Sequence, residues 1–231
     1  MNFLQLAQRV ALETGVSLTG PSAVANQTGR LGQIVKWTIT ADVDIQTLHN
    51  NWKFMRSGFT VNTTSGDGKY VFGDCTDTGS SAVIAKFREW CRDTPLKIYK
   101  TASGVGTETD LAYIPYEDWY ARYNLGAQTN SHPSYWSIDR DNGLLLGPKP
   151  DAIYTVSGDY MKAATELSVD ASEPAFPADY HMAIVYRAMM KYARYVGAPE
   201  IFSDGQAEYQ RVLREMRRTQ LPDAWEPGPL A

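Results

Sequence analysis

The sequence predicts an α+β protein, in which a helical bundle formed by the N- and C-terminal helices carries an inserted antiparallel β domain. Apolar residues recur at helical spacing near both ends of the chain. Between them, short apolar runs alternate with Gly, Thr, Ser and Asn, a pattern typical of strands and turns. Neither helical end has enough apolar faces to fold alone, so we expect the two ends to pack together. The expected divisions are residues 1–56, 57–165, 166–219 and an extended tail, 220–231.

Two helices are expected in the first division. The first covers residues 2–15, with Asn2 as its N-cap. The second covers about residues 30–56, because apolar residues recur there at alternating intervals of three and four. These residues are Leu31, Ile34, Thr38, Ala41, Ile45, Leu48, Trp52 and Met55. Irregular charges beside this seam favour a core helix over an oligomeric coiled coil. Trp37 and Phe54 lie off the seam and could meet a second partner.

The middle division contains six segments with the character of strands. They are residues 69–73, 96–100, 111–115, 135–139, 144–148 and 152–160. Residues 80–93 suit either a short helix or a strand, and we favour a strand over residues 86–90. A short helix is expected from Pro115, since proline is tolerated in the first turn of a helix.

The stretch "DRDNG" raises the possibility of a calcium loop, with Asp139 and Asp141 at the first and third positions. The fifth position is Gly143, which has no side-chain oxygen, and the twelfth is Pro150 instead of glutamate. We therefore interpret Asp139, Asp141 and Asn142 as turn formers of a β-hairpin, with Gly143 supplying the positive φ.

Two further helices are expected in the C-terminal division. The first starts near Pro177 and ends at Gly197, and the second covers about residues 200–219. The second is expected to turn a row of arginines outward near its C-terminus, where positive charge complements the helix dipole. These residues are Arg211, Arg214, Arg217 and Arg218.

The residues do not predict a catalytic or metal site. Cys75 and Cys91 are too few for a disulfide framework, and no signature links either thiol to a histidine base. The three histidines, His49, His132 and His181, are scattered along the chain, which argues against zinc. His181 is interpreted as a solvated or capping residue at a helix start. We expect no enzyme activity, no metal and no cofactor.

The net charge of -4 argues against tight binding to a nucleic-acid backbone. No apolar run approaches the ~20 residues of a membrane span, and the N-terminus does not resemble a signal peptide. We therefore expect that the protein does not associate with a membrane. We also expect that it is synthesised in a cytoplasm. The 14 Tyr and 6 Trp suit either protein interfaces or a β-rich core.

Four segments in order carry a resemblance to a known family. They are "GVSLTGPSAVANQTGRLGQIVKWTITADVDIQTLHNNWKFMR", "YIPYEDWYARY", "HPSYWSIDRDNGLLLGPKPDAIYTVSGDYMKAATELS" and "FPADYHMAIVYRAMMKYARYVGAPE". Together they resemble the adaptor proteins of tailed bacteriophages, also called head-completion or connector proteins. They are similar to the gatekeeper tail tubular proteins of short-tailed phages.

This resemblance implies a structural virion protein made in the host cytoplasm. Its copies would form a ring, commonly twelve-fold, at the neck of the particle. The ring would join the portal protein to a tail, nozzle or stopper protein, and double-stranded DNA would pass through its lumen without specific binding. The alternative is a virion-associated attachment module that binds a tail fibre or a neck protein.

Ring contacts join two different faces of each subunit, so both faces must be complementary. The candidate faces are the off-seam surface at Trp37 and Phe54 and the arginine surface of the last helix, and the tail is a further candidate. In one interpretation, the proline-flanked tryptophan of the tail anchors residues 220–231 on the portal or on an adjacent subunit. In the other, the tail is a frayed terminus. The interface residues expected in the last helix and the tail are Arg211, Arg214, Arg218, Pro222, Trp225 and Pro227.

Overall fold

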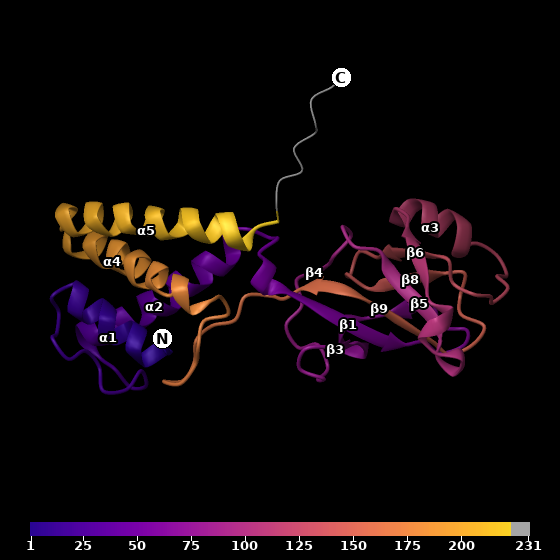
Figure 1. The fold of residues 1–231 in the computed structure, drawn as a ribbon, viewed down its shortest axis with the longest axis horizontal. Helices are drawn as coiled ribbons and strands as arrows, with labels where there is room; N and C mark the ends of the chain where they lie inside the picture. Colours follow the sequence, from indigo (N-terminus) through magenta and orange to yellow (C-terminus); the bar gives the residue numbers. More distant parts are fainter. Residues whose placement is uncertain (223–231) are drawn as a thin grey trace, which may run out of the picture. The chain divides into compact units, whose positions relative to one another are not determined.

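The structure, a computed structural model, describes residues 1–222 (Figure 1). Contacts divide the chain into two compact units. The terminal unit joins Met1–Met55 to the residues from Ala164 onward, and the middle unit is Arg56–Ala163. Within the described residues there are five α-helices and one curled β-sheet, so the prediction of a mixed α and β protein is confirmed.

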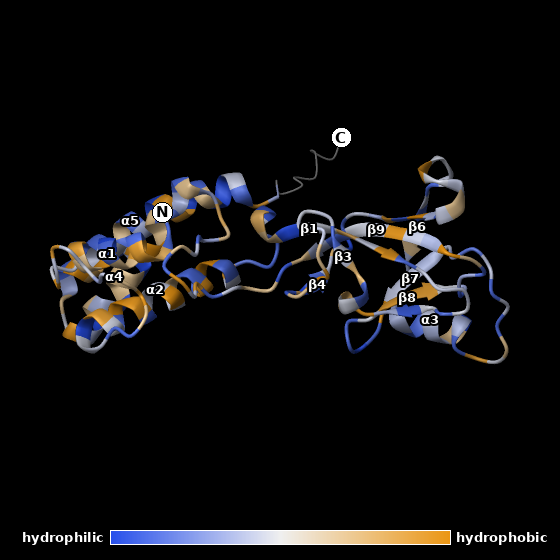
Figure 2. Ribbon diagram, turned by 90° about the horizontal axis from the view of Figure 1, so that it is seen from below, coloured by the Kyte–Doolittle hydropathy of each residue, from blue (hydrophilic) through white to orange (hydrophobic). Residues whose placement is uncertain are grey.

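Four helices build the terminal unit: α1 (Phe3–Glu13), α2 (Gly29–Thr47), α4 (Met182–Val196) and α5 (Pro199–Gln220). Helix α4 contacts the other three, and α1 also contacts α2. Figure 2 shows hydrophobic and hydrophilic residues alternating along these helices, as expected for helices that bury one face. The buried residues of α4 are Ala183, Ile184, Val185, Ala188, Met189, Met190, Tyr192 and Ala193.

Local sequence sets where three of these helices begin or end. At α1, the Asn2 side chain accepts from the N–H of Gln5, and the Gln5 side chain accepts from the N–H of Asn2. Gly197 ends α4 with a φ of 71°, in the left-handed region that glycine adopts without steric cost. Pro199 then occupies the first turn of α5, where its missing N–H needs no partner.

The helix expected over residues 30–56 is shorter than predicted. Helix α2 ends at Thr47, and a 3-10 turn, η1 (Lys53–Met55), follows. The seam residues from Ile34 to Ile45 are buried, but Leu48 is 41% exposed. Two asparagines, at positions 50 and 51, favour a turn over a helix. The buried Trp52 lies over the end of α2, where its indole N–H donates to the carbonyl oxygen of Ile45 at 3.0 Å.

The middle unit is built on a nine-stranded sheet with the order β2-β8-β7-β6-β5-β9-β1-β3, and β4 also pairs with β9. The strands are β1 (Arg56–Asn62), β2 (Lys69–Tyr70), β3 (Thr76–Asp77), β4 (Glu89–Trp90), β5 (Leu96–Lys100), β6 (Thr109–Tyr113), β7 (Tyr135–Ile138), β8 (Leu144–Gly147) and β9 (Tyr154–Met161). Its buried core includes Phe59, Trp90, Leu96, Ile98, Trp136, Leu144, Val156 and Tyr160.

The expectation of a wholly antiparallel domain is wrong at one pair, because β6 and β7 are parallel. A parallel pair needs a crossover connection of about a dozen residues or more. Helix α3 (Tyr116–Tyr123) and the loop after it provide that crossover between the two strands. The prediction also missed β1 and β3. Residues 72–74, partly expected as strand, form a short 3-10 turn instead.

The hairpin turn between β7 and β8 differs in one detail from the prediction. Asn142, not Gly143, has the positive φ, 61°. The carboxylate of Asp139 accepts from the N–H groups of Asp141 and Gly143, at 2.8 and 2.6 Å. A Cβ at Gly143 would lie 2.9 Å from Asp139 Oδ2 and 3.0 Å from Cε of Lys69. A side chain at position 143 would therefore displace the Asp139 carboxylate or the end of the Lys69 side chain, while asparagine at position 142 tolerates the left-handed conformation.

Candidate protein-interaction surfaces

Trp37, one of the expected interface residues, lies at the contact between α2 and α4. Its ring centroid is 5.5 Å from that of Tyr195 and 6.0 Å from that of Tyr192. Tyr192 is buried, whereas Tyr195 is 60% exposed. The aromatic side chain of Trp37 is thus partly used inside the subunit, and the exposed part of this cluster is carried mainly by Tyr195.

Phe54 belongs to a second aromatic cluster, at η1. Its ring stacks on Trp52 at 5.3 Å and lies 5.5 Å from the ring of Phe176. Phe176 in turn contacts His181, which is buried, and Nε2 of His181 lies 3.0 Å from the carbonyl oxygen of Phe176. The interpretation of His181 as a solvated residue is therefore wrong, whereas His181 does occupy the N-cap position of α4, without a capping hydrogen bond from its side chain. Burial lowers the pKa of His181.

The outward face of α5 carries three of the four expected arginines. Arg211 pairs with Glu208 and Arg218 with Glu215, each one helical turn away, and Arg214 is exposed. Such pairs stabilise a helix by only ~0.2–0.5 kcal/mol each, so these side chains remain available to a partner. Arg217, also expected to face outward, is half-buried, and its Nε donates to Nε2 of His49 at 3.2 Å.

A cation cluster joins α4 to α2. Asp44 Oδ2 lies 3.0 Å from both Arg187 Nη2 and Lys191 Nζ. The next basic residue of α4, Arg194, lies instead over the ring of Phe202, 5.1 Å from its centroid. The three cations of α4 thus have two roles, because two of them hold α2 and the third covers an aromatic side chain of α5.

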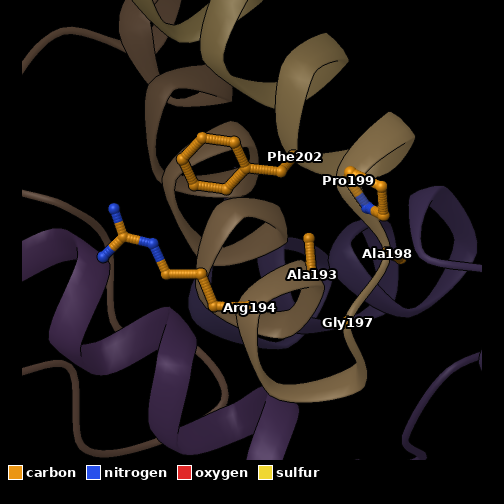
Figure 3. A pocket seen from close by; sticks show the side chains of 6 residues that line it. All are labelled: Ala193, Arg194, Gly197, Ala198, Pro199 and Phe202. Carbon is orange, nitrogen blue, oxygen red and sulfur yellow. The ribbon is translucent and has the colours of Figure 1, made fainter.

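An open groove lies where α4 turns into α5, and Figure 3 shows its six lining residues. Its volume is about 430 Å³, within the ~300–1,000 Å³ range of small binding pockets. The lining is mainly apolar and comprises Ala193, Arg194, Gly197, Ala198, Pro199 and Phe202. Small residues line much of it, while Phe202 and the Arg194 side chain extend on one side (Figure 3).

Asp42 is a buried carboxylic acid on α2 that the sequence did not single out. Its Oδ2 accepts from Nε2 of Gln46 at 2.8 Å, and its Oδ1 has no partner among the described residues. Gln46 also holds Thr165, accepting from its N–H and donating to its carbonyl oxygen, at 2.9 and 3.0 Å. Burial raises the pKa of Asp42 to about 7.

The middle unit has a polar pocket between α3 and the β7–β8 hairpin, with a volume of about 290 Å³. Its lining includes Lys69, Asp139 and Trp119. Lys69 forms an ion pair with Asp139. The Nε1–H of Trp119 is buried and has no acceptor among residues 1–222. This pocket combines charge with an unused donor, which suits a polar group from another molecule.

The two thiols have the character of core residues. Cys75 and Cys91 are free and buried. Burial raises the pKa of Cys75 to about 12 and that of Cys91 to about 11, so both thiols stay protonated at neutral pH and are poor nucleophiles. Among the residues that the structure describes, no group of three or more His, Cys, Asp or Glu could hold a metal ion.

The structure does not bring the expected interface residues into one patch. Trp37 and Phe54 belong to separate clusters, and the α5 arginines form a third surface. Pro222 is exposed at the end of the described chain, while the expected contacts of Trp225 and Pro227 fall outside the described residues. None of the helices within residues 1–222 has both the length and the apolar character needed to cross a membrane.

Comparison with protein families gives one match that spans nearly the whole chain. The family is described as SU10 adaptor protein, and its model matches residues 1–230. The match therefore includes both units and the tail. A search of curated proteins finds no significant match.

Proposed function

This chain belongs to the SU10 adaptor protein family, a family of phage adaptor proteins, and we propose that its copies assemble into a ring that joins the portal to the tail. Membership of this family makes the chain a virion component. The match over residues 1–230 is the observation that carries the proposal. The finer resemblance to gatekeeper tail tubular proteins is part of the same proposal, as is a twelve-fold ring.

In this proposal, the four helices of the terminal unit form the bundle that packs around the ring, and the middle unit is a β domain inserted between α2 and α4. Two exposed surfaces on different helices support it, because heterologous ring contacts require two different faces. One is the aromatic surface at Tyr195 and Trp37, and the other is the arginine surface of α5.

The ring lumen is proposed to pass double-stranded DNA without holding it. The net charge of -4 supports this role, since strong binding to the phosphate backbone needs clustered Lys and Arg. Two of the α5 arginines are paired with glutamates of the same helix, which reduces the positive potential of that face.

We also propose that the chain has no enzymatic activity. Buried thiols with raised pKa values support this view, because a nucleophilic cysteine needs a thiolate at neutral pH. The histidine that is most buried, His181, is held by the backbone of Phe176 and packs on its ring, as a core residue does.

A second candidate function is an attachment module for a tail fibre or a neck protein. The polar pocket of the middle unit favours it, because the buried Nε1–H of Trp119 has no acceptor in the described chain. A buried donor without a partner costs about 1–3 kcal/mol, and a docking protein could supply the acceptor.

Sedimentation of the chain with and without purified portal protein from the same phage separates these proposals. For the ring adaptor, we expect the portal to recruit many copies, approaching one for each portal subunit. Reversing two charges, by Arg211→Glu with Arg214→Glu, is expected to weaken this recruitment. Recruitment of only a few copies, or of none, would favour the attachment module.

A further inference from the structure

We propose that the groove between α4 and α5 binds the C-terminal segment, residues 223–231, of a neighbouring copy of this chain. Trp225 would enter the groove. The inference rests on the proposed function, which supplies neighbouring copies. The inference states that the tail binds the α4–α5 groove of another subunit and does not bind the groove of its own subunit.

The groove has the chemistry to hold an aromatic side chain beside proline. Its apolar wall includes Phe202, which is half-buried, and Pro199, which is exposed. Short side chains at Ala193 and Ala198, and none at Gly197, leave the space open between them (Figure 3). Grooves lined by aromatic residues are common receptors for extended, proline-rich segments.

The tail has the complementary composition. It contains Trp225 between Pro222 and Pro227, and prolines pre-order an extended segment, which lowers the entropy lost on binding. Tryptophan is also among the residues that most often dominate binding energy when it fills a pocket. The composition thus combines an aromatic residue with flanking prolines in one short segment.

The charges of the two partners also match. The charged residues of segment 223–231 are Asp223 and Glu226, both acidic and both within two positions of Trp225. The groove presents the Arg194 guanidinium, which lies over Phe202, whereas Arg187 and Lys191 on the same helix pair with Asp44. Arg194 is therefore the cation of α4 that is best placed to meet a carboxylate from outside.

The reach of the chain shows why the donor is a neighbour. The groove lies at the first turn of α5, and the tail leaves from its last turn. Helix α5 has 22 residues, so at ~1.5 Å per residue it is about 33 Å long. From Gln220, the chain extends at most ~3.6 Å per residue, so Trp225 lies within about 18 Å of the end of α5. It cannot return to its own groove.

A titration in solution tests the inference without assembly. A fluorescently labelled peptide of residues 220–231 is mixed with the full-length chain, kept dilute so that it remains monomeric, and anisotropy is recorded. Since no monomer can fill its own groove, we expect saturable binding. The peptide with Trp225→Ala is expected to bind roughly tenfold more weakly or worse. No saturable binding, or equal binding of both peptides, would overturn the inference.

Variants of the chain test the position of the site. Arg194→Glu is expected to weaken the peptide several-fold, and a peptide with Asp223→Lys and Glu226→Lys is expected to recover that loss. Arg30→Glu is the matched control, because Arg30 is an exposed arginine of α2 outside the groove. Equal effects of the two chain variants, or no recovery with the lysine peptide, would place the peptide elsewhere.

Cross-linking in the assembled state separates this inference from the proposed function. A photoreactive amino acid at position 225 is placed in the full chain, which is then mixed with portal and irradiated. We expect cross-links to residues 193–202 of another copy. Cross-links to the portal alone would refute the inference and leave the ring proposal intact. If no ring forms, the proposed function fails and the peptide titration still decides the inference.

Discussion

Replacing Asp42 by asparagine is expected to stabilise the terminal unit at neutral and alkaline pH. The carboxyl group is fully buried, and one of its oxygens lacks a partner in the described chain. A buried carboxylate with so few donors is unstable as an anion. Burial accordingly raises the pKa of Asp42 from 3.8 to about 7.

The direction of the pH effect follows from the protons that each state binds. Between about pH 4 and pH 7 the folded chain keeps the proton of Asp42, while the unfolded chain loses it. The free energy of unfolding therefore falls as the pH rises through this range, and it levels off above about pH 7. At ~1.4 kcal/mol per pKa unit, the full loss is about 4 kcal/mol.

An asparagine in place of Asp42 would keep an oxygen that accepts from Gln46, and it cannot ionise. In urea unfolding followed by far-UV circular dichroism, Asp42→Asn and the parent chain should have similar stability at pH 4. At pH 8 the variant should be more stable, by up to about 4 kcal/mol. A variant that is equally stable or less stable than the parent chain at pH 8 would refute this reasoning.

Asp44→Asn is the matched control, since it removes the same charge from the same helix. Asp44 is partly exposed and pairs with Arg187 and Lys191. Its replacement should lower stability slightly at pH 8, by no more than about 1 kcal/mol. The two variants are therefore expected to shift the free energy of unfolding in opposite directions at that pH.

Two further substitutions test packing in each unit. Trp52→Phe removes the hydrogen bond to the Ile45 carbonyl and should lower the free energy of unfolding by about 1–3 kcal/mol, as measured by urea unfolding. An unchanged unfolding midpoint would show that this bond does not hold the end of α2. Gly158→Ala places a Cβ against Leu96 and near Phe59, so it should cost about 1–3 kcal/mol. A neutral effect on thermal unfolding of the variant would contradict the close approach of β9 to these side chains.

Periodicity alone located most of the helices and several strands. The seam from Leu31 to Ile45 is a helix, and the strand over residues 96–100 is observed with the same bounds. The end of α2 was not predicted, because Trp52 continues the seam spacing while its side chain lies over the helix end. Periodicity indicates which residues are buried, but it does not indicate whether a buried residue lies within the helix or in the turn after it.

Features that depend on long-range packing were beyond the sequence. The parallel pairing of β6 and β7 requires the α3 crossover to return in one particular direction. Asp42 resembles any polar residue of a helix until its burial is known. The groove at the start of α5 is lined by Gly197 and Pro199, and of these Gly197 was interpreted from the sequence only as the signal for a helix end.

The interface hypotheses were only partly within reach of the sequence. Trp37 and Phe54 were identified because they lie off the helix seam, but the structure shows that both already contact aromatic neighbours in the same subunit. Tyr195, which is 60% exposed beside Trp37, was not among the interface residues expected from the sequence. The sequence spacing places Trp37 and Tyr195 on helices, but it does not show which of the two rings is the more exposed.

The central claim, that this chain is a ring-forming adaptor, is tested most directly by electron cryomicroscopy of the chain bound to its portal. We predict a closed ring of copies that is coaxial with the portal and surrounds an open channel, with helices of the terminal unit at the contacts between subunits. Isolated copies bound at the periphery of the portal, with no closed ring and no shared channel, would contradict the account.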